Sequence, residues 1–354
     1  MISDSNSKNH GRGAAINTPN RFMKSTVVAD YEEGLDELQA FSNETQWLKE
    51  NAKTIVNKVT STDVGMAFSL NPYQGCEHGC IYCYARNTHE YWGYSAGVDF
   101  EQKIIVKHNA PELFKKHISA KNYSPEPISL SGNTDCYQPA ERTFKLTRQL
   151  LSTALAFNQP IGIITKNALI LRDLDILSEM AKKQLVCVYI SITSLDESLR
   201  RMLEPRTVTA ARRLQTIQAL SKQGVPVGIM TAPIIPGINE QEIPHLLKAA
   251  ADSGALYAGH TIVRLNGAIQ HLFKEWLFRT MPDRAEKVWH LIESCHGGTV
   301  NDNQFGRRMR GDGPVAEMIR KQHQLFCKKY SLNKTRFQFN TSAFKIPTAQ
   351  QALF

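Results

Sequence analysis

The feature that most constrains the fold is a regular alternation of short β-rich runs with helical patterns. The runs, rich in valine and isoleucine, lie at residues 66–73, 127–134, 160–167, 186–193, 225–234 and 259–265. Near-continuous apolar runs that are separated by helices are typical of parallel strands buried on both faces. Right-handed crossovers then give an α/β fold, either an open doubly wound sheet or a partial barrel. In both, chemistry gathers at the carboxyl ends of the strands.

Two of the helical patterns are well marked. The pattern that follows Pro139 places Phe144, Leu150 and Phe157 on its apolar side. The pattern VTAARRLQTIQALSKQG is predicted to begin after Thr207, as its N-cap, and to stop at Gly224. Both patterns support helical crossovers between the strands.

The flanking regions differ from this alternating core. Residues 1–27 are polar and rich in glycine, serine and asparagine, which predicts a flexible N-terminal arm. Residues 28–60 carry helical patterns such as LDELQAFSNETQWLKENA, so we expect a helical lead-in to a domain that spans residues 28–270. Residues 271–342 are predicted to form a basic helical extension, and residues 343–354 a short tail.

Bulk composition indicates a globular chain with a sizeable core. Hydrophobic residues make up 42% of the chain and charged residues 21%, which is ordinary for such proteins. The N-terminus has no apolar signal-peptide core, and no apolar window is long enough to span a membrane. The seven cysteines are an odd number and mostly scattered, which favours a reducing cytoplasm over a disulfide framework.

Positive charge is concentrated near the C-terminus. Residues 271–354 contain 14 Lys and Arg against 7 Asp and Glu, within a formal net charge of +9 for the whole chain. A basic C-terminal quarter that includes the loop GRRMRG suggests a nucleic-acid partner. A merely solvated basic surface is the alternative.

The stretch NPYQGCEHGCIYCYAR places Cys76, Cys80 and Cys83 in a C-x3-C-x2-C spacing directly after the first predicted strand. Thiolates bind both zinc and iron–sulfur clusters. A structural zinc site would need a fourth ligand, for which His78 and His89 are available. The alternative is a [4Fe–4S] cluster with three irons held by the protein and one left open for a substrate or cofactor.

This motif, with an aromatic residue before its third cysteine, resembles the signature of the radical SAM superfamily, and the resemblance covers about residues 66–265. It implies a partial (β/α)6 TIM-type barrel and an open iron that is chelated by S-adenosylmethionine. The reduced cluster of that family cleaves S-adenosylmethionine to methionine and a 5′-deoxyadenosyl radical, which takes a hydrogen atom from the substrate. The resemblance also implies that Tyr82 packs near the adenine.

Two further segments match motifs of the superfamily. SGNTD, at residues 131–135, stands where the family binds the methionyl amino group. PIIPGINE, at residues 233–240, resembles the adenine-side motif, with Pro233 in place of its first glycine, and makes Gly237 a cofactor-binding residue. A proline- and glycine-containing turn after the fifth strand is the alternative interpretation of that segment.

The closer resemblance is to the spore photoproduct lyase-like branch, in which the radical reverses a thymine dimer in DNA. Four features carry this resemblance: tyrosines on both sides of Cys83, a Ser-Asp pair after the second strand, a lysine after the third strand and a serine in the fourth. The matching cofactor-binding residues here are Tyr82, Thr134, Asp135, Lys166 and Ser191. A lysine at a strand end, taken alone, is more often simply solvated.

One departure concerns the hydrogen donor. The lyase has a donor cysteine at the position that matches Gly132, and Cys136 lies four residues further along. We therefore expect Tyr84 and Cys136 to be the candidates for radical transfer on the substrate side. Glu204 and Arg206, in LEPRT, either contact the cofactor or substrate or form an internal ion pair.

These observations predict a cytoplasmic radical SAM enzyme in which Cys76, Cys80 and Cys83 ligate a [4Fe–4S] cluster. A nucleic acid is the expected substrate, and a flavodoxin or ferredoxin the expected reducing partner. The alternatives are radical modification of a peptide or small molecule, and a non-catalytic nucleic-acid-binding protein with a structural metal. The terminal QQALF resembles peptides that dock on the replication sliding clamp, or else folds back onto the protein.

Overall fold

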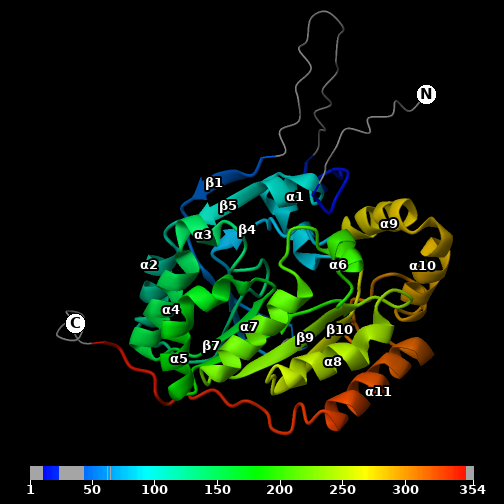
Figure 1. Cartoon of the computed structure of the whole chain (residues 1–354). Coiled ribbons are helices and arrows are strands. Elements are labelled where there is room, and N and C mark those ends of the chain that lie inside the picture. Colours follow the sequence, from blue (N-terminus) through cyan, green and yellow to red (C-terminus); the bar gives the residue numbers. More distant parts are fainter. Residues whose placement is uncertain (1–10, 24–43, 62, 64, 348–354) are drawn as a thin grey trace, which may run out of the picture.

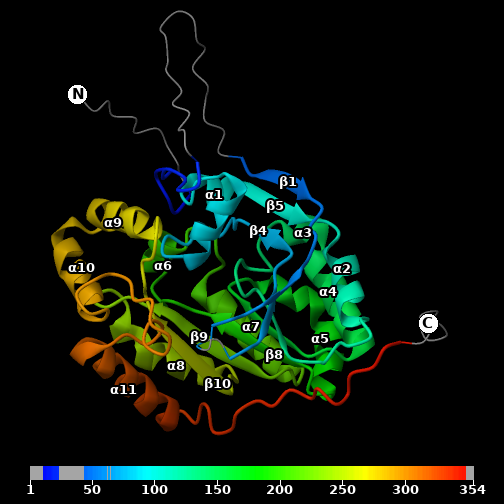
Figure 2. The same cartoon turned by 180° about the vertical axis from the view of Figure 1, so that it is seen from behind.

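The computed structural model describes residues 11–23, 44–61, 63 and 65–347. Its main sheet has seven strands in the order β10-β9-β8-β7-β6-β3-β2 (Figures 1 and 2). The strands are β2 (Val56–Lys58), β3 (Phe68–Leu70), β6 (Ile128–Leu130), β7 (Ile161–Thr165), β8 (Val186–Ser191), β9 (Val227–Ile234) and β10 (Tyr257–Ile262). Among the described strands of this sheet, β2 alone pairs antiparallel, with β3.

The six predicted β-rich runs correspond to the six parallel strands, which follow one another across the sheet in chain order. Sequential parallel pairing without strand reversal is the topology of a barrel that has not closed, because the strands β2 and β10 remain at opposite edges. The structure therefore selects the partial barrel from the two folds that the pattern allowed. All six strands point their carboxyl ends to one side.

Helices cover the outer face of this sheet (Figure 1). They are α2 (Ala110–Ile118), α4 (Leu146–Phe157), α5 (Leu174–Lys182), α7 (Ala210–Lys222) and α8 (Ile243–Asp252). Two short helices, α3 (Glu141–Phe144) and α6 (Glu197–Leu203), lie toward the carboxyl ends of the strands. The apolar side of α4 is buried as predicted. The N-cap of α7 is Thr209, whose hydroxyl accepts from Arg212 N, rather than Thr207. Thr207 instead binds a buried carboxylate, described below.

The predicted helical lead-in is wrong for the residues that the structure describes. Gln46–Glu50 form strand β1, which pairs in parallel with β5 (Lys103–Lys107). Strand β5 also pairs with β4 (Tyr73–Gln74), which makes a second, three-stranded sheet. Partners far away in sequence decided these conformations, against the local helical pattern. Residues 24–43 lie outside the described residues.

The N-terminal arm also differs from the prediction. Residues 11–23 are packed against the body of the protein, beside α1 (Val98–Gln102) (Figure 1). Ala14 is only 1% exposed, and Arg21 pairs with Glu90 at 3.1 Å. The expected flexible arm is therefore an ordered part of the structure over this stretch.

The C-terminal extension is helical, as predicted, with α9 (Ile269–Thr280), α10 (Ala285–Ser294) and α11 (Gly313–Lys329). These helices form one flank of the molecule (Figure 2), where Phe273, Trp276 and Trp289 lie in a second apolar cluster. The chain then crosses the amino ends of the strands, where Lys345 N donates to Phe157 O. QQALF lies outside the described residues. Within the part of the chain that the structure describes, none of the helices could serve as a membrane span.

Candidate functional site

The cysteine motif follows β3 and the short strand β4 and forms a loop that leads into a 3-10 helix, η1 (Tyr84–Trp92), at the carboxyl end of the parallel strands. Cys76 and Cys80 are buried and Cys83 is half-buried. Backbone bonds fix the loop to its surroundings: Cys76 N donates to Phe100 O and Ile81 N donates to Leu203 O. The loop is therefore held on both sides before any ligand binds.

The donor set of this loop suits an iron–sulfur cluster better than a single zinc ion. Burial raises the pKa of Cys76, Cys80 and Cys83, so only a bound metal would hold these thiols as thiolates. No three His, Cys, Asp or Glu side chains among the described residues are arranged to hold one metal ion. A [4Fe–4S] cluster does not need that convergence, because each thiolate binds a different iron.

Neither of the two histidines considered as zinc ligands belongs to a group of side chains that could hold a metal ion among the described residues. His78 lies between Asp135, at 3.4 Å from Nδ1, and Asn167, at 3.4 Å from Nε2. His89 packs against the rings of Tyr94 and Phe100, with centroids 5.3 and 5.6 Å away. Neither contact supports the single-zinc alternative.

A buried ion pair that sequence reasoning missed supports the loop from behind. Arg86 and Glu101 are both fully buried, and their Nη2 and Oε1 atoms lie 2.5 Å apart. Arg86 Nε also donates to Cys80 O at 2.9 Å. The sequence shows an arginine three residues after Cys83, but nothing in it indicates which carboxylate would be the partner.

The segment after β6 connects neighbouring strand ends. Thr134 Oγ1 donates to Tyr73 O at 2.6 Å. Asp135 accepts from Thr165 Oγ1 and from Lys166 N, both at 2.8 Å, so its carboxylate joins the ends of β6 and β7. With His78 also near Oδ2, both oxygens of Asp135 have partners within the protein. This geometry makes Thr134 and Asp135 positioning residues for the site.

A second buried network lies beside the cysteine loop and is centred on Glu204. The carboxylate is fully buried and accepts from Tyr82 Oη, from Thr193 Oγ1 at 2.5 Å and from Arg213 Nη2 at 2.6 Å. Burial alone would raise the pKa of Glu204, but Arg213 and Lys166 hold it well below its usual value. Of the two interpretations of Glu204, the structure supports the internal ion pair.

Lys166 and Ser191 lie at the edge of this network. Lys166 Nζ is 3.6 Å from Glu204 Oε1 and lies over the Tyr82 ring, 5.9 Å from its centroid. Ser191 is buried at the end of β8, where its carbonyl accepts from Arg213. The predicted residues Tyr82 and Lys166 thus meet at one carboxylate, and Ser191 is linked to it through its backbone carbonyl and Arg213.

Tyr84 lies on the open side of the cysteine loop. The residue is 48% exposed, and its hydroxyl donates to Gly132 O at 2.7 Å. A Cβ at Gly132 would lie 2.8 Å from Ser69 Cβ, so a larger side chain there requires a shift of β3. Arg264, after β10, is close enough for Tyr84 and Arg308 to influence its pKa, which burial lowers. Arg264 has no salt bridge among the described residues.

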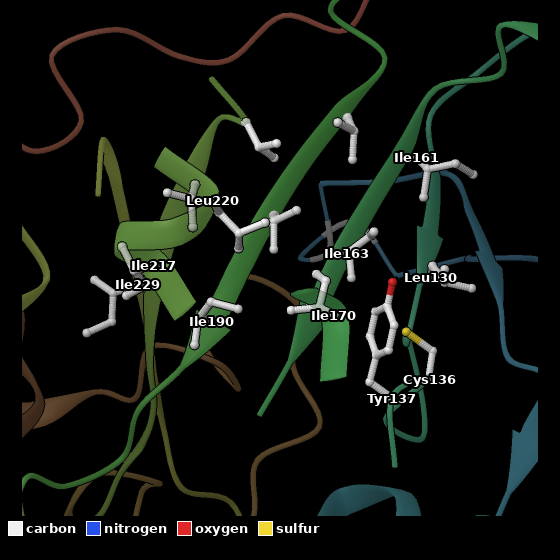
Figure 3. Close-up of a cluster of buried hydrophobic side chains, with 14 of the residues drawn as sticks. Leu130, Cys136, Tyr137, Ile161, Ile163, Ile170, Ile190, Ile217, Leu220 and Ile229 are labelled. Carbon is white, nitrogen blue, oxygen red and sulfur yellow. The ribbon is translucent and has the colours of Figure 1, made fainter. Parts of the chain in front are cut away.

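Two predicted site residues lie away from this opening. Cys136 is fully buried in the main core, and Figure 3 shows it beside Leu130 and Tyr137. Gly237 has a positive φ of 80°, and a Cβ there would contact Val288 and Leu291 of α10. The structure therefore corrects the expectation that Cys136 faces the substrate, and it favours the turn interpretation for Gly237.

Arg206 forms a weak ion pair with Glu77 in the cysteine loop, at 3.9 Å, and its amide donates to His78 O at 3.3 Å. Its guanidinium therefore contributes to holding the loop.

Three proteins of similar sequence are described only as uncharacterised. An uncharacterised protein of Mycobacterium tuberculosis is 33% identical over 244 residues, which cover 68% of this chain and 71% of the relative. An uncharacterised protein of Methanocaldococcus jannaschii is 31% identical over 179 residues, covering 50% of this chain and 64% of the relative. An uncharacterised protein of Acidianus two-tailed virus is 27% identical over 210 residues, covering 56% and 68%.

The similar solved structures share the fold at low sequence identity. Spore photoproduct lyase complexed with dinucleoside spore photoproduct is 16% identical, covers 83% of this chain and 85% of its own, and gives a TM-score of 0.54. A mutant of that enzyme with bound AdoMet and the dinucleoside is also 16% identical, covers 80% and 79%, and gives a TM-score of 0.52. The family model described as the radical SAM superfamily matches residues 70–250. The chain therefore belongs to the radical SAM superfamily and is a radical SAM enzyme, with a [4Fe–4S] cluster and S-adenosylmethionine as its cofactors.

Proposed function

We propose that Cys76, Cys80 and Cys83 hold the [4Fe–4S] cluster and that the enzyme uses it to modify a nucleic acid, in a reaction related to lesion repair. The ligand assignment rests on the only three cysteines that share one loop at the strand ends. The other four cysteines of the chain are buried and far apart in the sequence. When bound, the cluster and S-adenosylmethionine supply a 5′-deoxyadenosyl radical, which takes one hydrogen atom from the substrate.

The protein's own residues provide a preformed cofactor site. We assign Lys166, Ser191 and Tyr82 to the S-adenosylmethionine side, because the Glu204 network holds all three at adjacent strand ends. Thr134 and Asp135 act as positioning residues. Thr134 joins the segment after β6 to Tyr73, ahead of the cysteines, and Asp135 joins it to the end of β7. Buried hydrogen-bonded networks of this kind fix side-chain positions and so reduce reorganisation on binding.

The observation that carries the nucleic-acid assignment is the combination of Arg264 and Tyr84 at the opening. Arg264 is partly buried and forms no direct ion pair among the described residues, although Asp63 lies near enough to raise its pKa, and a guanidinium in that state suits a phosphate. Tyr84 is half-exposed, and a base can stack on its ring. The loop of residues 301–311 adds Arg307, which pairs with Asp302, and Arg308, which pairs with Asp63. The basic C-terminal quarter supplies further positive charge.

We assign the hydrogen-donor role to Tyr84 instead of Cys136. The Tyr84 hydroxyl donates to the carbonyl of Gly132, and Gly132 matches the position where the lyase-like branch has a donor cysteine. Transfer of a hydrogen atom from the phenol to a substrate radical leaves a tyrosyl radical. An electron from the reducing partner and a proton from solvent restore the phenol, so the step balances.

The test is anaerobic reconstitution followed by reduction in the presence of S-adenosylmethionine. We expect 5′-deoxyadenosine to form, and deuterium from labelled oligonucleotides carrying pyrimidine lesions to appear in it. Label transfer from peptides or small metabolites, with none from any oligonucleotide, would establish the alternative substrate class. Absence of cleavage in a fully loaded, reduced protein would contradict the cofactor assignment.

Three further assignments are proposals about partners and location. A flavodoxin or ferredoxin is proposed as the electron donor, because the cluster must be reduced before each cleavage. A cytoplasmic location is proposed because such a cluster and seven thiols need a reducing compartment. The terminal QQALF is proposed to bind the sliding clamp, which co-purification with and without the last five residues would test.

A further inference from the structure

The stretch Gly11–Phe22, which we name the strap, lies beside α1 (Figure 1) and contacts the cysteine loop at Gly79. The contact is closest at Gly13, where a Cβ would lie only 1.7 Å from Gly79 O. Gly79 stands between Cys76 and Cys80 and has a positive φ of 68°. Backbone therefore meets backbone here, and neither glycine leaves space for a side chain.

The strap is connected to Cys80 by a short series of buried hydrogen bonds. Gly13 N and Ala14 N donate to the two carboxylate oxygens of Glu101, at 2.9 and 2.8 Å. Glu101 binds Arg86 at 2.5 Å, and Arg86 Nε donates to Cys80 O at 2.9 Å. Displacement of the strap would thus reach the loop through two charged, fully buried side chains.

Glu101 depends on the strap for two of its hydrogen-bond donors. The carboxylate is fully buried, and two of its donors are the strap amides. Leaving a buried carboxylate short of donors is costly, so Glu101 and Arg86 would rearrange if the strap left. Gly79 faces the same carboxylate, since its Cβ would lie 2.7 Å from Glu101 Oε2.

Further bonds hold the rest of the strap in place. Thr18 N donates to Ser95 Oγ at 2.7 Å, and Asn20 Nδ2 donates to Glu90 O at 2.8 Å and to Tyr94 O at 3.1 Å. Arg12 Nη1 donates to Glu101 O at 2.7 Å. The attachment is therefore specific along its length, and it converges on the segment that follows the cysteines.

We propose that the strap is part of the cluster-binding apparatus, with Glu101 and Arg86 as positioning residues that transmit its docking to the backbone of Cys80. This inference rests on the proposed assignment of Cys76, Cys80 and Cys83 as the cluster ligands. The strap sets the conformation of the loop between the first two ligands and shields that side from solvent. Docking of the strap and loading of the cluster stabilise each other, because the coupling between two binding events is reciprocal.

The primary test compares Gly13→Ala with Gly65→Ala in the full chain. Gly65 has no atom within 4 Å of its ideal Cβ and is the matched control. We expect Gly13→Ala to lower the apparent affinity for the cluster by about 10- to 100-fold, measured as the iron retained per chain. This is the range for residues that support metal ligands. It should also speed bleaching of the cluster in air and change the electron paramagnetic resonance signal of the reduced cluster. Gly65→Ala should match the wild type in all three.

Glu101→Gln is the second variant, because it keeps the side-chain shape but removes the charge that Arg86 needs. We expect it to lose iron as Gly13→Ala does. Unfolding temperatures of the iron-free proteins show whether either variant fails for general instability. Hydrogen exchange of the wild type provides the measurement that needs no variant: the amides of Gly13 and Ala14 should exchange at least about tenfold more slowly after loading, by reciprocal coupling.

Equal exchange in the empty and loaded wild type would overturn the proposal, as would wild-type iron retention in Gly13→Ala. Its failure is separable from that of the ligand assignment. If Cys80→Ala loses the cluster while Gly13→Ala keeps it, only the role of the strap is wrong. If Cys80→Ala keeps the cluster, the ligand assignment itself is wrong.

Discussion

The two sides of the cysteine loop differ in how their polar groups are satisfied. On the strap side, Glu101 and Arg86 are fully buried and neutralise each other. On the open side, Tyr84 is half-exposed, and Arg264 has no ion-pair partner among the described residues. A closed, internally paired surface is typical of a structural support. An unpaired cation beside an exposed aromatic ring is typical of a surface that binds a ligand. The comparison separates residues that hold the cofactors from residues that meet the substrate.

The largest effect should come from the loop itself. Cys80→Ala removes a proposed ligand, so we expect loss of the cluster and at least about a 100-fold fall in 5′-deoxyadenosine formation, more than supporting residues contribute. Iron analysis and product quantification measure this. Cys327→Ala, which changes a cysteine on α11, is the control and should keep both iron and activity. A loaded, active Cys80→Ala enzyme would remove the basis for treating this loop as the cofactor site.

The next effect tests the buried support beside the loop. Glu204→Gln leaves Arg213 buried without its counter-charge, which should cost about 3–5 kcal/mol of unfolding free energy in the iron-free protein. Denaturant unfolding at neutral pH measures it. An unchanged midpoint would show that the network is not a structural support.

The ion pair between Glu204 and Arg213 also makes the stability of the fold depend on pH. Burial would raise the pKa of Glu204, but Arg213 and Lys166 keep it below the usual value of 4.5. The ionised carboxylate therefore stabilises the fold fully above about pH 4.5, and this contribution is lost as the pH falls toward the lower folded-state pKa. The stability difference between wild type and Glu204→Gln should be constant near neutrality and should shrink in acid. A difference that grows on acidification would contradict the proposed charge state.

The open side is tested by substrate binding. Arg264→Ala should weaken oligonucleotide binding about tenfold and reduce the salt slope by about one, as for a single phosphate contact. Cluster loading should remain normal. Arg212→Ala removes an exposed arginine of α7 and should leave affinity unchanged. Equal losses in both variants would indicate a diffuse charge effect without a specific contact.

The smallest effects on S-adenosylmethionine cleavage should come from the two proposed hydrogen donors. Tyr84→Phe removes the hydroxyl that binds Gly132 O, so we expect cleavage to continue while substrate product forms at least about tenfold more slowly, or about 1.4 kcal/mol in barrier. Cys136→Ala should change neither rate, because this thiol is buried in the core. Product yield per 5′-deoxyadenosine measures both. The reverse result would assign the donor role to Cys136.

Residue pattern alone determined the parallel strands, the helical crossovers and the cysteine loop at the strand ends. These features depend on local hydrophobic periodicity and on ligands that are close in sequence, so a single chain displays them. The grouping of Tyr82, Lys166 and Ser191 was predicted from the resemblance of these positions to cofactor-binding residues of the lyase-like branch. The apolar character of α4 and the positive φ of 72° at Gly224 are of the same local kind.

Only the tertiary structure decided which chain segments meet. Gln46–Glu50 form a strand because they pair with β5, although their local pattern is helical. The strap could not be recognised because backbone amides, which every residue carries, make its contacts with Glu101. Cys136 entered the core although it stands one residue after Asp135, since neighbouring side chains after a strand can point to opposite sides. Long-range pairing, backbone contacts and side-chain direction leave no periodic signal in a sequence, and these decided how the site is supported.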